Sequence, residues 1–137
     1  RKADIKLVLY NILRIRARAQ EKKFPVPVFV WNMIMHDQSI HYLPRSVSVG
    51  LEAGVRSFVW SVLGETPILE GALTPRQLSH LSKEDFQRGL KAMEHAKEIC
   101  AKGQATAQIS PGLQQLIDNL KTNWNLAAMT SPIELPV

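Results

Sequence analysis

The chain has 137 residues, about one domain, and its 45% apolar and 21% charged residues predict a folded rather than a disordered protein. No apolar run reaches the roughly 18 residues that cross a bilayer, and the single cysteine excludes an intrachain disulfide. These features predict a cytoplasmic globular protein and rule out membrane-spanning, collagen-like and disulfide-scaffold classes.

The positive charge is concentrated at the N-terminus. Residues 1–24 hold eight Lys and Arg against Asp4 and Glu21, a net charge of +6, whereas nine basic and ten acidic residues give the remainder −1. Such asymmetry is typical of a neutral body joined to a basic face that binds a polyanion, although a solvated basic helix face has the same composition.

Residues 4–10 alternate between apolar and other side chains. Ile5, Leu7 and Leu9 fall on one side and Lys6, Val8 and Tyr10 on the other. This period of two predicts a short strand with one apolar face. Asn11 then favours the start of a helix over 12–23, although the alternation continues through 13–19 and leaves a longer strand open.

Proline interrupts the pattern after residue 23. Pro25 ends the preceding helix, and Pro27 suits the first turn of a second helix over about 27–39. The β-branched and aromatic residues Val26, Val28 and Phe29 leave a strand as the competing interpretation.

Helices are also predicted over most of the C-terminal part. The apolar spacing favours a helix over 52–63 that Gly64 ends, and Thr74-Pro75 has the form of a helix start. Ser82 precedes the clearest helix, which ends at Gly103. Residues 103–110 are small and polar and predict a loop, Ser110-Pro111 opens a helix to about Trp124, and an extended tail follows from Thr130.

A strand, a helix, a break and a second helix within residues 4–39 resemble the ribbon-helix-helix DNA-binding family, which includes the Arc, MetJ and CopG-type regulators. The apolar alternation matches that family's strand, and Val26-Pro27-Val28 resembles its inter-helix turn. The resemblance implies a mainly α fold with an intermolecular two-stranded ribbon. We therefore expect a DNA-binding and dimerisation unit at 1–40, a helical extension at 41–130 and a tail at 131–137.

A lone strand with an apolar face needs a partner strand, and in a homodimer two copies would form a ribbon that fits the major groove of double-stranded DNA. In that arrangement Lys6, Val8 and Tyr10 would read base edges, with Asp4 at the ribbon's end. Phosphate contacts are expected from Arg1, Lys2 and Arg14, and from backbone N–H groups near Pro27 and Val28.

The sequence does not indicate a metal site, a phosphate-binding loop or a nucleophilic cysteine. The four histidines, His36, His41, His80 and His95, have no metal-binding spacing, and no glycine-rich phosphate loop is present. Cys100 lies on an apolar helix face and is interpreted as a core residue. We therefore expect neither an enzyme, nor a metal, nor a cofactor.

The leading expectation is a homodimeric transcriptional regulator that binds DNA, with the C-terminal helices free to bind a second protein and no role for a membrane. The alternative is a helical protein-interaction module whose basic face binds an acidic partner. A third possibility is a membrane-surface protein in which residues 5–23 form one basic amphipathic helix.

Overall fold

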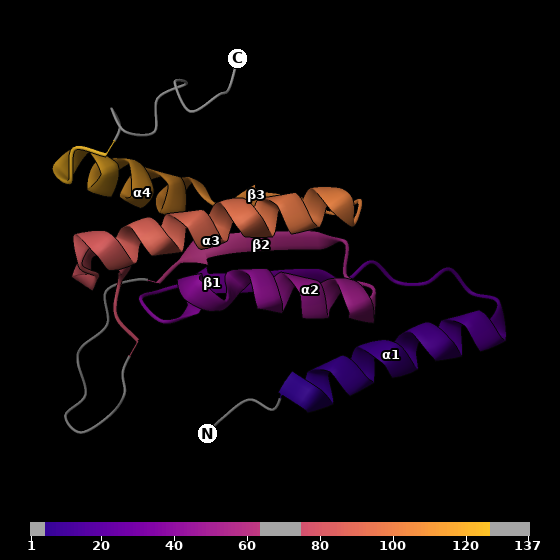
Figure 1. The fold of residues 1–137 in the computed structure, drawn as a ribbon. Helices are drawn as coiled ribbons and strands as arrows, with labels where there is room; N and C mark the ends of the chain where they lie inside the picture. Colours follow the sequence, from indigo (N-terminus) through magenta and orange to yellow (C-terminus); the bar gives the residue numbers. More distant parts are fainter. Residues whose placement is uncertain (1–4, 64–74, 127–137) are drawn as a thin grey trace, which may run out of the picture.

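The computed structural model describes residues 5–63 and 75–126, which build an α/β arrangement around a three-stranded parallel sheet. The strands are β1 (Val30–Met35), β2 (Ser57–Val62) and β3 (Thr106–Ile109), in the order β1-β2-β3. The helices are α1 (Ile5–Lys22), α2 (Leu43–Ala53), α3 (Lys83–Lys102) and α4 (Pro111–Asn123), with 3-10 turns η1 (Ser39–Tyr42) and η2 (Leu78–His80). Figure 1 shows α2 and α3 in front of the sheet and α1 set apart below them.

One face of the sheet builds the core. Phe58 and Trp60 on β2 are fully buried, and the register places Trp31 and Met33 of β1 beside them. The rings of Trp31 and Phe58 stack with centroids 6.4 Å apart. Because strand residues alternate between faces, this set points toward the helices that cover the sheet.

The opposite face, here called the open sheet face, carries no charged residue and is largely exposed within the described part of the chain. Its eight positions are Val30, Asn32, Ile34, Ser57, Val59, Ser61, Thr106 and Gln108. Val30 is 60% exposed and Ile34 is 49% exposed. Parallel sheets are ordinarily covered on both faces, so this half-covered sheet is unusual.

The predicted N-terminal ribbon is wrong, and with it the mainly α ribbon-helix-helix fold. Residues 5–22 form one continuous helix, α1, where a strand over 4–10 and a helix over 12–23 were expected. No second strand pairs here among the described residues, and an isolated strand is not stable. Leu9, Ile12 and Ala19 instead fall on one helical face, which lies against α2.

The two following predictions also need correction. Residues 24–29 form no regular element and lead into β1, so the helix over 27–39 is wrong. A strand does form here, but only from Val30 and after Val26, Val28 and Phe29. The helix over 52–63 is wrong because α2 already ends at Gly54 and the chain then forms β2. Gly54 adopts φ +100°, a left-handed conformation that stops a helix and that glycine accepts without strain.

The C-terminal helices are confirmed. Ser82 Oγ accepts a hydrogen bond from the Asp85 N–H at the start of α3, and Ser110 Oγ does the same for the Leu113 N–H at the start of α4. The loop expected over 103–110 is wrong, because it contains β3. Pro75 opens no α-helix and only η2 follows it; Thr74 and the predicted tail lie outside the described residues.

A candidate binding site on the N-terminal helix

The first helix is attached to the body by a narrow stripe. In α1 only Ala19 is buried, and Leu9, Ile12 and Arg16 on the same face are partly covered. Arg16 Nη1 donates a 2.9 Å hydrogen bond to the carbonyl oxygen of Ala53, at the C-terminal end of α2. That end of a helix carries unsatisfied carbonyls and partial negative charge, so a guanidinium there stabilises the contact.

Much of the apolar surface of α1 and the segment after it remains exposed. Twelve large hydrophobic side chains are exposed among residues 5–63 and 75–126, and all except Tyr42 lie between Ile5 and Ile34. Phe24 is 67% exposed and Val28 is 83% exposed. A concentration of exposed apolar side chains in one segment is typical of a surface that contacts a partner.

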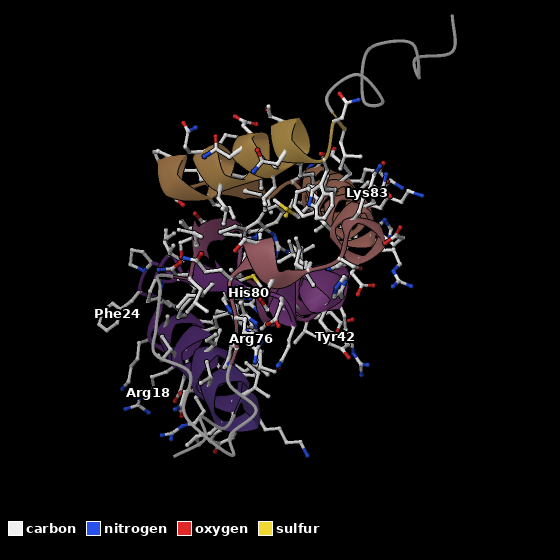
Figure 2. The ribbon with its side chains drawn as sticks, turned by 90° about the vertical axis from the view of Figure 1, so that its left-hand side faces the viewer. Arg18, Phe24, Tyr42, Arg76, His80 and Lys83 are labelled. Carbon is white, nitrogen blue, oxygen red and sulfur yellow. The ribbon has the colours of Figure 1, made fainter. Side chains whose placement is uncertain are left out.

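A groove of about 1170 Å³ lies between the C-terminal half of α1 and residues 24–27. Arg14, Arg18 and Lys22 line it from the helix, at positions that fall in one row because they are four residues apart. Phe24, together with Pro25 and Pro27, lines it from the segment that follows the helix. Figure 2 shows the side chains of Arg18 and Phe24 projecting on the same side, away from the body. We call this feature the basic groove.

The end of α1 fixes the wall that carries Phe24. Lys23 adopts φ +58°, and the Phe24 N–H donates a 2.9 Å hydrogen bond to the Ala19 carbonyl. This left-handed residue followed by a bond to the carbonyl five residues earlier is a Schellman motif. It reverses the chain direction and holds Phe24 next to the last turn of the helix.

The residues predicted to read DNA bases do not share one face, because they lie on a helix rather than on a strand. Lys6 and Tyr10 lie on one side of α1, and Val8 points to the opposite side, so the three do not form one reading face. Arg14 Cζ lies 5.6 Å from the centre of the Tyr10 ring.

Two of the remaining predicted positions, Pro27 and Val28, belong to the part of the chain that the structure describes. Pro27 lines the groove and Val28 follows it, exposed. Arg1, Lys2 and Asp4 lie outside the described residues.

Several residues of the site escaped the sequence argument. Arg16 anchors the helix, and Phe24 and Pro25 form a wall where only a helix break was expected. The spacing of Arg14 and Arg18 was visible in the sequence, but their relation to Phe24 depends on the reversal at Lys23.

A second polar cluster lies at the carboxyl end of β1, where ligands often bind in parallel sheets. His36 Nδ1 accepts hydrogen bonds from the backbone N–H groups of Gln38 and Ser39, at 3.2 and 3.3 Å. Asp37 Oδ1 also lies 3.6 Å from His36 Nδ1. Ser39 Oγ donates to the Ile34 carbonyl. These hydrogen bonds join residues 34–39 and close the turn into η1.

Cys100 and the metal-ligating side chains are the groups that bear on nucleophilic and metal chemistry. Burial raises the pKa of the Cys100 thiol, which disfavours the reactive thiolate. Residues 5–63 and 75–126 contain no group of three metal-ligating side chains, and no helix among them is long and apolar enough to cross a membrane. No protein-family model, no curated protein and no solved structure matches this chain.

Proposed function

We propose that this chain is a protein-interaction module whose N-terminal helix binds an acidic partner protein. The observation that carries the proposal is the basic groove, where the row of Arg14, Arg18 and Lys22 faces the apolar wall formed by Phe24 and its neighbouring prolines. Carboxylates pair with guanidinium groups through two parallel hydrogen bonds, and an apolar wall adds contact area.

The mixture of charged and apolar surface favours a protein over duplex DNA. Most protein–DNA contacts join cations to phosphates, which offer nothing for an exposed phenylalanine or leucine to pack against. Leu7 is 55% exposed on the cationic side of α1, and Phe24 forms the groove wall. The β-ribbon that was expected to read base edges is also absent from residues 5–22.

The attachment of α1 favours a protein over a membrane surface. An interfacial helix inserts its apolar face between lipids. In this chain the middle of that face is occupied by Leu9, Ile12 and Ala19 against the body, and Arg16 is bonded to Ala53. The cations of the basic groove, in contrast, are accessible while the helix remains docked.

The proposal is tested by fluorescence anisotropy with a labelled glutamate-rich peptide, a labelled DNA duplex and vesicles that contain anionic lipid. We expect binding to the peptide that weakens with salt and falls at least about tenfold in the double variant Arg14→Glu/Arg18→Glu.

A matched control separates local contacts from net charge. Arg45→Glu/Lys91→Glu changes the total charge equally at two exposed positions, on α2 and α3, and should leave peptide binding nearly unchanged. Equal losses in both double variants, or binding only to the duplex or the vesicles, would refute the proposal.

A further inference from the structure

We infer that the basic groove receives an extended segment of the partner in which acidic residues alternate and an apolar side chain contacts Phe24. This inference rests on the proposed function and specifies the site and the sequence class of the partner. The partner segment must match the basic groove in three respects: the spacing of its charges, its apolar contact with Phe24 and the sign of its charge.

The spacing of the cations matches an extended chain. Arg14, Arg18 and Lys22 follow one another every four residues, which is about 6 Å along an α-helix. In an extended strand every second side chain points the same way, and such side chains are about 6.6 Å apart. Carboxylates at alternate positions of an extended segment therefore meet successive cations of the row. A helical partner would reach the same spacing of about 6 Å with acids at every fourth residue, which is a different sequence pattern from alternating acids.

The apolar wall is held in place before any partner arrives. Proline fixes the backbone on both sides of Val26, and the Schellman motif at Lys23 fixes the direction in which the chain leaves α1. Ordering such a wall on binding costs little conformational entropy, so the exposed ring of Phe24 is a suitable anchor. A segment whose carboxylates meet the cations also carries intervening residues, and one of these can contact Phe24 because this ring lines the same groove.

One acidic residue already lies in the basic groove. Glu21 Oε2 is 3.8 Å from Arg18 Nη1, and both side chains are about two-thirds exposed, at 66% and 69%. An ion pair this exposed contributes little to stability. Glu21 therefore occupies the position that a carboxylate of the partner would take, and it is readily displaced. Removing its charge should tighten binding.

The test uses two labelled peptides with the same number of glutamates at alternate positions. One carries a phenylalanine between them and the other a serine at that place. With the intact chain we expect the phenylalanine peptide to bind about tenfold more tightly than the serine peptide. Phe24→Ser should remove this difference, and Glu21→Gln should tighten binding of both.

Tyr42 provides the matched control. It is 66% exposed, like Phe24 at 67%, but lies on η1, on the opposite side of the view in Figure 2. Tyr42→Ser should therefore bind both peptides like the intact chain. Circular dichroism checks that each variant is folded, which is expected because both rings are exposed.

The outcomes separate this inference from the proposed function. If both peptides bind equally and Phe24→Ser changes nothing, while Arg14→Glu/Arg18→Glu still abolishes binding, the inference is wrong and a purely electrostatic interaction remains. If neither peptide binds to the intact chain, the proposed function fails as well. A gain in affinity when the same glutamates are placed consecutively would also overturn the alternating arrangement.

Discussion

Gly54 is a single residue that affects both α1 and α2. Its left-handed backbone ends α2, and a Cβ placed there would lie 2.6 Å from the guanidinium carbon of Arg16. Any side chain at this position would therefore strain the backbone and also displace the arginine that holds α1. The same residue determines where one helix stops and where another is attached.

We expect Gly54→Ala to lower the free energy of unfolding by about 2 kcal/mol, since a non-glycine residue in this conformation costs 1–2 kcal/mol and the Arg16 contact is lost as well. Urea denaturation followed by circular dichroism measures the change. Gly112→Ala is the control, because a Cβ there meets only Val62 Cγ1 at 3.4 Å, an ordinary contact. A similar loss of stability in both variants would contradict the role assigned to Gly54.

Residue identity alone revealed part of the candidate site. The excess of cations in the first 24 residues pointed to the region that contains the basic groove, and Arg14, which was expected to contact DNA phosphates, lines that groove. Lys6, Val8 and Tyr10 were grouped by an alternation that a helix breaks apart. Arg16 was missed because its hydrogen-bond acceptor, the carbonyl oxygen of Ala53, is far away in the sequence. The local pattern shows only an arginine within an apolar helical face.

At the scale of elements, α1 and α3 are held very differently. Both are long helices, but α3 buries five residues, including Phe86 and Met93, whereas α1 buries only Ala19. Helical stability in proteins comes mainly from packing of the apolar face. The stability of α1 therefore depends on its narrow stripe and on Arg16.

Hydrogen exchange measures this difference. We expect the backbone amides of α1 to exchange much faster than those of α3, because a weakly packed element opens locally without unfolding the whole protein. Arg16→Ala should accelerate exchange in α1 and leave α3 unaffected. Equal protection of the two helices in the intact chain would show that α1 opens only together with the core.

The elements that the sequence predicted correctly are those with local signals. The serine caps at Ser82 and Ser110 mark α3 and α4 within a few residues of sequence. β2 and β3 have no such local signal, because each is short and its pairing partner is distant in the chain. An apolar run such as 58–60 fits a buried strand and a buried helix equally well.

The sheet has one packed face and one open face. Two neighbouring residues of β1 lie on these two faces and differ in exposure. Met35 is 1% exposed, whereas Ile34 is 49% exposed. We expect Met35→Ala to lower the free energy of unfolding by about 2–5 kcal/mol and Ile34→Ala by less than about 1 kcal/mol. Urea denaturation of the two variants measures both values. A large loss for Ile34→Ala would mean that the open sheet face is covered in solution.

The purely parallel sheet also affects how the chain reaches this structure. Val30 pairs with Ser57 and Ser57 pairs with Thr106, so no two neighbouring strands are joined by a hairpin. Each pairing must close a long loop and lose its entropy before the contact stabilises anything, which slows folding relative to a helical bundle of the same length. α2 and α3 shorten these loops once they form. The rate-limiting step is therefore expected to be the docking of strands across preformed helices.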